Sequence, residues 1–136
     1  MKAQTALIVT SYFAHLGLCD SGGSAIGTAT TYQAPYIPNK CYHGNSFQVP
    51  HSGLFAAVGP GLWDNGLICG QYYQIRCVEG LGVAGGKCTG KMITVKIVEG
   101  RLGRNAPEFS LSYVAAPMLY SGGGRFKVEY AEVRHP

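Results

Sequence analysis

The sequence predicts a mainly β domain of about six short strands and one short helix, closed into a small barrel. Three observations favour this class. Twenty Gly and seven Pro in 136 residues indicate many turns. Nine Tyr and the single Trp favour sheet over helix. Hydrophobic residues make up 46% of the chain against 13% charged residues, which is typical of one compact domain and not of a disordered chain.

Short segments that alternate apolar and polar residues, or that concentrate β-branched ones, predict the strands. They are residues 27–32, 54–58, 72–77, 93–98 and 127–133. Segments rich in Gly, Pro and Asn lie between them, and these predict a loop at 36–47, a tight turn at 59–66 and a hairpin loop at 79–86.

The one helix is expected to begin at Ser110, a residue type that caps helix N-termini well. Its apolar stripe would consist of Leu111, Val114, Ala115 and Leu119. Pro117 should disturb its last turn, and a run of three glycines follows before the final strand.

The first 25 residues are typical of a signal peptide. Lys2 is a minimal positive start, residues 6–18 are mostly apolar, and small residues lead to a plausible cut after Ala25. The domain then covers residues 26–136. The alternatives for the first segment are an N-terminal strand or a disordered arm. The segment is too short to span a membrane, and no other stretch approaches the length needed.

Cysteine usage favours an oxidising compartment. Cys19 lies in the expected signal peptide, which leaves an even number: Cys41, Cys69, Cys77 and Cys88. Four cysteines in a short secreted chain imply two disulfides, with three possible connectivities. The alternative is a set of buried cytosolic thiols. No metal site is expected, because the chain has no CxxC pair and its histidines lack metal-ligand spacing with the cysteines.

The formal charge of +4 is mild, and the basic residues are scattered along the chain. Without a basic run or a basic helix, no nucleic-acid partner is expected. A modest positive charge fits weak attraction to an acidic surface such as a pectin-rich wall.

Several motifs occur in order: GTATTY at 27–32, PYIP at 35–38, LWDNG at 62–66, CGQYYQIRC at 69–77, CTGK at 88–91 and VKIV at 95–98. In this order and spacing, over residues 26–133, the chain resembles the plant natriuretic peptides, also described as family-45 endoglucanase-like domain proteins. That group belongs with the expansins and barwin. The resemblance therefore implies a six-stranded double-psi β-barrel with one or two short helices.

The resemblance also implies the disulfide pairing, Cys41 with Cys69 and Cys77 with Cys88. Many members of the natriuretic type have a further cysteine pair after the VKIV strand. This chain has no cysteine at 99–104, so a third disulfide is not expected.

Catalysis is not expected, because a glycosidase needs two facing carboxylates. Asp64 lies in a Gly-rich turn and Glu99 follows the VKIV strand, so each is either a groove acid or a turn-capping or solvated charge. Expansins carry an acidic Asp at the position that matches Ser110. A serine hydroxyl does not titrate near neutral pH and cannot replace that acid. We therefore predict no catalytic residues, no cofactor and no hydrolase activity.

The resemblance implies a secreted, non-enzymatic signalling protein of the apoplast, a monomer that acts in water and ion homeostasis through a cell-surface receptor. Tyr and Arg are favoured anchors of protein interfaces. The residues expected to contact the receptor are Tyr72, Tyr73, Arg76, Lys91 and Lys96.

The alternative functions are a cell-wall protein that binds polysaccharide and a defence protein of the barwin type. Both would use an open groove. The residues expected to line it are Thr30, Tyr32, Asp64, Glu99 and Ser110.

Overall fold

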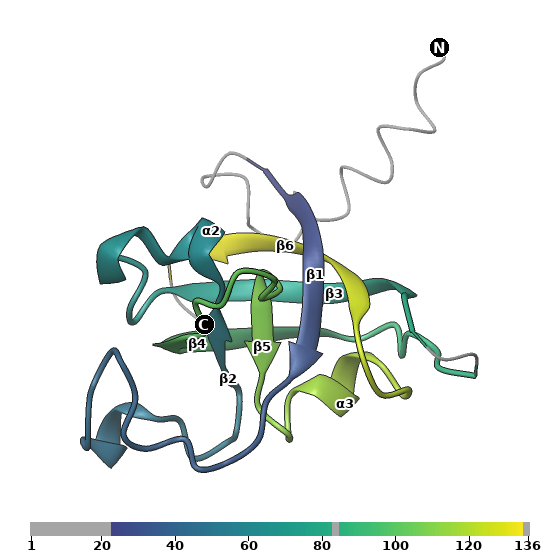
Figure 1. Ribbon diagram of the computed structural model, residues 1–136. Coiled ribbons are helices and arrows are strands. Elements are labelled where there is room, and N and C mark those ends of the chain that lie inside the picture. The colour runs from purple at the N-terminus through teal and green to yellow at the C-terminus, as the bar shows by residue number, and fades with distance from the viewer. Residues whose placement is uncertain (1–22, 83–84, 135–136) are drawn as a thin grey trace.

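The computed structural model describes residues 23–82 and 85–134, and its sheet has six strands. They are β1 (Ala25–Thr31), β2 (Phe55–Val58), β3 (Tyr72–Gly80), β4 (Met92–Gly100), β5 (Phe109–Leu111) and β6 (Phe126–Val133). The strands close into a barrel in the order β1-β5-β2-β4-β3-β6 (Figure 1). The predicted fold class, a mainly β double-psi barrel with six strands, is confirmed.

Two parallel strand pairs lie within an otherwise antiparallel barrel. β1 runs parallel to β5, and β2 runs parallel to β4. The longer strands β3, β4 and β6 form antiparallel pairs around the rest of the wall. Closure leaves no long sheet edge for another chain to pair with.

The expected helix from Ser110 is wrong. Ser110 lies inside β5, where it pairs with Thr30 of β1 and with Ala57 of β2. Pairing on both sides outweighs the local preference of a serine for a helix cap. The helix is α3 (Ala116–Leu119), which begins just before Pro117, because a residue without an N–H is tolerated in the first turn.

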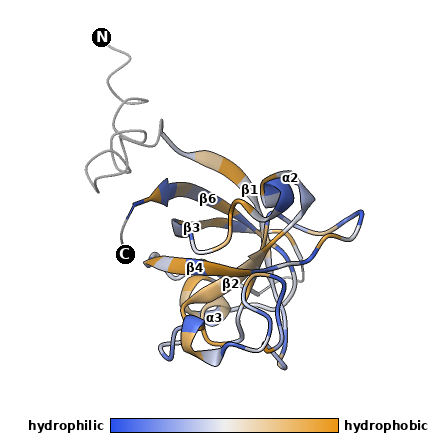
Figure 2. Ribbon diagram, turned by 90° about the vertical axis from the view of Figure 1, so that its left-hand side faces the viewer, coloured by the Kyte–Doolittle hydropathy of each residue, from blue (hydrophilic) through white to orange (hydrophobic). Residues whose placement is uncertain are grey.

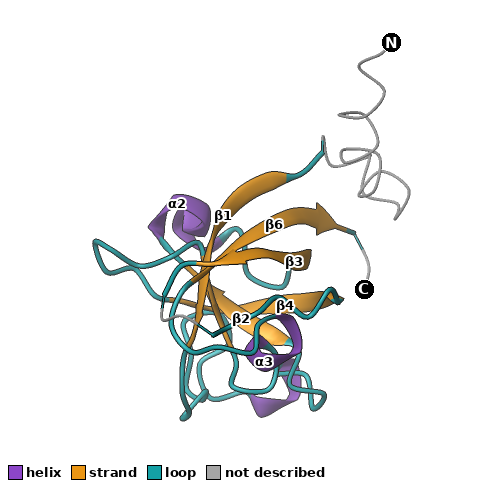
Figure 3. Cartoon of the chain, turned by 90° about the vertical axis from the view of Figure 1, so that its right-hand side faces the viewer, coloured by secondary structure: helices purple, strands orange, loops and turns teal. Residues whose placement is uncertain are grey.

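The other helical segments are short. α2 (Pro60–Trp63) and the 3-10 turn η3 (Asp64–Gly66) follow β2, and the 3-10 turn η2 (Ser46–Gln48) lies in the loop before β2. Figures 1 and 3 place α2 and α3 at opposite ends of the barrel.

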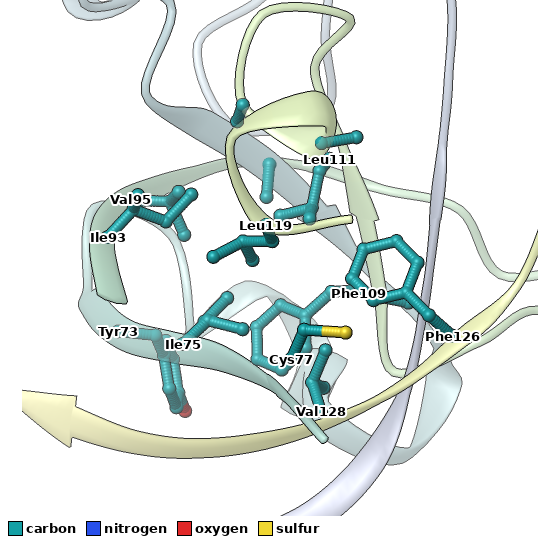
Figure 4. Close-up of a cluster of buried hydrophobic side chains, with 14 of the residues drawn as sticks. Tyr73, Ile75, Cys77, Ile93, Val95, Phe109, Leu111, Leu119, Phe126 and Val128 are labelled. Carbon is teal, nitrogen blue, oxygen red and sulfur yellow. The ribbon is translucent and has the colours of Figure 1, made fainter. Parts of the chain in front are cut away.

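The barrel interior is the core. Alternate residues of β3 and β4 point inward, so that Ile75, Val95 and Ile97 are fully buried. β2 is buried at every residue, and Figure 2 colours β2 and much of β4 as hydrophobic. In Figure 4 the side chains of Phe109 and Leu111 from β5 lie among the others of this cluster. A three-residue strand therefore contributes fully to the core.

Two disulfides join the pairs that the resemblance implies. Cys41 is bonded to Cys69, which attaches the loop after β1 to the segment before β3. Cys77 is bonded to Cys88, which closes the hairpin between β3 and β4.

Most of the expected signal peptide, residues 1–22, lies outside the described residues. The structure does describe its last residues. The Ser24 hydroxyl donates to Glu129 Oε2 at 2.6 Å, and Ala25 pairs with Tyr130 of β6. A cut after Ala25 would therefore remove two contacts to β6 and leave the rest of β1 in place.

Candidate functional site

A row of paired residues crosses four strands of the barrel. Thr30 of β1 pairs with Ser110 of β5, and Ser110 pairs in turn with Ala57 of β2. Ala57 then pairs with Glu99 of β4. Paired residues on neighbouring strands point to the same face of a sheet, so Thr30, Ser110 and Glu99 share one face.

A bulge puts Glu99 in this row. Ala56 pairs with Ile97, yet the next residue, Ala57, pairs with Glu99, so the register skips Val98. Since successive side chains alternate between faces, a shift of one residue changes which face Glu99 occupies. Val98 is fully buried in a cluster with Tyr32 and Phe55, and Glu99 is half-buried at the surface.

The row forms part of an open cleft of about 530 Å³. Loop residues complete it: Lys40 comes from the loop after β1, Arg101 from the segment after β4, and Arg125 from the residue before β6. The remaining lining residues are Thr31, Gly100, Leu102, Gly103, Ala106 and Pro107. The cleft thus combines hydroxyl groups, cations and one carboxylate.

The carboxylate of Glu99 is bound by the backbone. Its Oε1 accepts hydrogen bonds from Lys40 N at 2.8 Å and from Gly100 N at 3.1 Å. The neighbouring Cys41 N donates to Val98 O at 3.3 Å. Glu99 therefore anchors the loop after β1 to the end of β4, in addition to lining the cleft.

Ser110 is 2% exposed at the floor of the cleft. The Ser110 hydroxyl can donate and accept hydrogen bonds, but it does not ionise near neutral pH. Among the described residues that line the cleft, Glu99 is the one carboxylate. The pair of facing acids that glycoside hydrolysis uses is therefore not formed by these lining residues.

Tyr32 lies beside the cleft, just after β1, and is 6% exposed. The Arg101 guanidinium lies over its ring at 5.4 Å from the centroid. Burial, with the negative charge of Glu99 as a smaller cause, raises the pKa of the Tyr32 hydroxyl well above its usual range. The ring thus supports Arg101 and does not itself line the cleft.

Asp64 is not brought to this cleft. Asp64 and Asn65 have left-handed backbone conformations, with φ of 48° and 53°, which turn the chain sharply after α2. Asp64 lines a separate depression with Tyr73 and Glu132. In the sequence Asp64 and Glu99 are similar candidates for an acid in the groove. The left-handed turn at Asp64 and Asn65 is what separates them in space.

The residues expected to contact a receptor do not form one exposed surface. Tyr73 has the inward parity of β3 and is 6% exposed, and burial raises its pKa to about 12. Tyr72 is half-buried on the opposite face, and Lys91 is exposed at the start of the β4 hairpin arm. The alternation of residues 72–77 was the signal that could have placed Tyr73 inside.

The other two expected receptor residues have intramolecular partners. Arg76 Nη2 lies 2.5 Å from Glu129 Oε1, in an ion pair between β3 and β6. Lys96 Nζ donates to the carbonyl and to the side-chain oxygen of Gln48, each at 2.9 Å. Both side chains therefore hold neighbouring segments of the fold.

The cations of the cleft are candidate functional residues that the sequence analysis did not assign. Lys40, Arg101 and Arg125 are far apart in the chain and stand out there only as scattered basic residues. Their grouping depends on the barrel closing, so no local pattern could have found them.

The described part of the chain contains no helix long and apolar enough to cross a membrane. Across residues 23–82 and 85–134, no three His, Cys, Asp or Glu side chains are grouped in a way that could hold a metal ion.

No model of a known protein family matches the chain. Its solved structural neighbours include apo-expansin of Clavibacter michiganensis, with a TM-score of 0.61 and 18% identity. A point mutant of that expansin in complex with cellohexaose has a TM-score of 0.59 and 22% identity. Both alignments cover 83% of this chain and 52% of the expansin chain, so this chain spans about half the length of those proteins. At these identities the likeness concerns the fold alone.

Curated plant proteins are more similar in sequence. EG45-like domain containing protein 2 of Arabidopsis thaliana is 31% identical over 93 residues, which are 68% of this chain and 67% of that protein. Putative EG45-like domain containing protein 1 of the same plant is 38% identical over 73 residues, 54% of each chain. The EG45-like domain containing protein of Citrus jambhiri is 27% identical over 100 residues, 73% of each. Since the first of these alignments covers two thirds of both proteins, this chain belongs to the EG45-like domain family.

Proposed function

We propose that this chain binds a polysaccharide chain along the cleft between β1 and β4 and does not hydrolyse it. The observation that carries the proposal is the row of Thr30, Ser110 and Glu99 in one open cleft. Hydroxyls and a carboxylate are the groups that hydrogen-bond sugar hydroxyls. The complex of a structurally similar expansin with cellohexaose supports the same kind of ligand.

The absence of hydrolysis is proposed from the chemistry of the row. Inverting and retaining glycosidases both need a second carboxylate across the scissile bond. The sequence resemblance matches Ser110 to a position where expansins carry an acid, and Glu99 Oε1 accepts hydrogen bonds from two backbone N–H groups. No second carboxylate among the described lining residues stands across the cleft to act with Glu99.

The place of action proposed is the extracellular space, at the cell wall. Two disulfides in a chain of this length are typical of secreted proteins. The predicted signal peptide at residues 1–25 supports the same location.

The experiment is a pull-down of the recombinant domain on insoluble wall polysaccharides, combined with an assay of reducing ends in the same tubes. We expect retention on at least one polymer and no release of reducing sugar above a heat-denatured control. Release of reducing sugar that disappears in a Glu99→Gln variant would contradict the non-hydrolytic proposal. A failure to bind any wall polymer would contradict the binding proposal.

Signalling in water and ion homeostasis through a cell-surface receptor is a second candidate, which rests on the sequence resemblance. Phe47, in the loop before β2, is the residue with which to test a contact with another protein, because at 90% it is the most exposed large hydrophobic side chain of the described residues. Swelling of leaf protoplasts by the purified domain, but not by a Phe47→Ser variant, would favour this function. Equal swelling by both would exclude Phe47 as the contact. A defence role of the barwin type would use the same cleft and stays a prediction.

A further inference from the structure

The cleft carries more positive than negative charge. Lys40, Arg101 and Arg125 line it, against the single carboxylate of Glu99. Neither Lys40 nor Arg101 lies within ion-pair distance of a carboxylate among residues 23–82 and 85–134. An excess of cations in a cleft with low-dielectric walls attracts an anionic ligand.

The nearby carboxylates offset only part of this charge, because Lys40, Arg101 and Arg125 outnumber Glu99 and Glu108. Glu99 Oε1 is occupied by the backbone N–H groups of Lys40 and Gly100. Glu108 lies close enough to Arg125 for the two charges to interact, but its Oε1 accepts from Thr28 N at 2.6 Å and from Thr28 Oγ1 at 3.0 Å. Both acids keep their charge, but neither forms an ion pair with Arg101 or Arg125, so the two guanidinium groups keep donors for a ligand.

The two arginines are positioned by their neighbours. Arg101 lies with its guanidinium over the Tyr32 ring, which leaves the N–H groups at its edge available. Arg125 Nη2 donates to Asn105 O at 2.7 Å, and a guanidinium has five N–H donors. A planar guanidinium matches a carboxylate with two parallel hydrogen bonds.

We propose that the cleft selects an acidic polysaccharide, a chain of uronic acid residues, over a neutral glucan. This inference rests on the proposed polysaccharide binding. The arginines would take the carboxylates of successive sugars, and the hydroxyls of Thr30 and Ser110 would meet their hydroxyl groups. No aromatic side chain is among the described residues that line the cleft, so it offers no stacking platform for the bases of a nucleic acid.

The test compares polygalacturonate with its fully methyl-esterified form, which keeps the sugar chain and removes the charge. We expect the disulfide-bonded domain to bind the acid form at least about tenfold more tightly, the loss expected when one charge-assisted hydrogen bond is removed. Raising the salt from about 0.05 M to about 0.5 M should abolish most of this preference, because it shortens the screening length well below the cleft's dimensions.

Arg101→Gln and Arg125→Gln are each expected to weaken binding of polygalacturonate by about tenfold and to leave binding of the methyl ester unchanged within about twofold. Lys87→Gln is the matched control, because it removes the same charge from an exposed position outside the cleft. Its affinity for polygalacturonate should stay within about twofold of the unmodified domain. Fluorescence of Trp63 verifies that each variant is folded.

The outcomes separate the two proposals. Equal binding of the acid and ester forms would overturn the selection for uronate and leave polysaccharide binding intact. Binding of neither form, nor of cellulose, would overturn the proposed function itself. Equal weakening by Lys87→Gln would show that net charge, and not the cleft, controls binding. Binding of dextran sulfate as tightly as polygalacturonate, with the same sensitivity to the two arginines, would also overturn the claim for uronate.

Discussion

Replacing Glu99 distinguishes an anchoring carboxylate from a catalytic one. Glu99→Ala removes an acceptor that serves Lys40 N at 2.8 Å and Gly100 N at 3.1 Å. Hydrogen bonds to charged groups contribute about 1.5–3 kcal/mol each, and Lys40 is exposed, so the lower end applies. We expect the variant to lose about 3 kcal/mol of unfolding free energy.

Glu99→Gln keeps an oxygen in the same place. A neutral amide oxygen accepts both N–H groups in bonds of about 0.5–1.5 kcal/mol each, so this variant should lose only about 1 kcal/mol. A catalytic acid would show the opposite pattern in an activity assay, because glutamine abolishes proton transfer as fully as alanine does.

Urea unfolding followed by tryptophan fluorescence measures both variants. Trp63 is the single tryptophan, and its ring packs on β4 beside Glu99, since a Cβ built on Gly100 would lie 2.7 Å from Trp63 Cε3. Equal losses for the Ala and Gln variants would refute the anchoring argument. So would a Glu99→Ala loss below about 0.5 kcal/mol, the usual range for a surface substitution.

Two further predictions concern residues 107–108, which lie beside the cleft just before β5. Burial acts to raise the pKa of Glu108, but hydrogen bonds from Thr28 and the charge of Arg125 lower it overall. The ionised carboxylate therefore contributes stability above its unfolded pKa, and this contribution is lost as the pH falls through the folded pKa. In urea titrations from pH 6 towards about pH 3, the unfolding free energies of the unmodified domain and of Glu108→Gln should therefore converge, and a constant difference would contradict this. Gly59→Ala would place a Cβ 2.3 Å from the Pro107 carbonyl oxygen, so it should lower the free energy of thermal unfolding by about 2–3 kcal/mol. Gly61→Ala is the control, because its Cβ meets no atom within 4 Å and the stability should change by no more than about 1 kcal/mol. Equal effects of the two variants would contradict the packing argument.

The strands that the sequence predicts well are those that face the core on one side. Residues 72–77 and 93–98 alternate, and Ile75 and Val95 are buried as their parity predicts. A period of two depends only on neighbouring residues, so a single sequence contains it. The same alternation predicts that Tyr73 points inward. It was instead assigned to a receptor contact because tyrosine has a polar hydroxyl and is common in protein interfaces.

β5 could not be predicted in this way. Its three residues Phe109, Ser110 and Leu111 are all buried, so they show no alternation. A serine followed by apolar residues fits a helix start equally well from local preference. Only pairing with β1 on one side and β2 on the other decides between them, and both partners lie more than fifty residues away.

The composition of the cleft depends on features with still weaker local signals. The bulge that skips Val98 has no Gly or Pro to mark it, yet it decides that Glu99, and not Val98, faces the cleft. The left-handed turn at Asp64 and Asn65 leaves Asp64 in a separate depression, although the sequence presents Asp64 and Glu99 as similar candidates. The bulge places Glu99 in the cleft and the turn keeps Asp64 out of it, so one carboxylate lines the cleft beside three cations. The fold therefore determines the sign of the cleft's charge, and that sign favours an anionic chain over the neutral one that a cellulose-like ligand would provide.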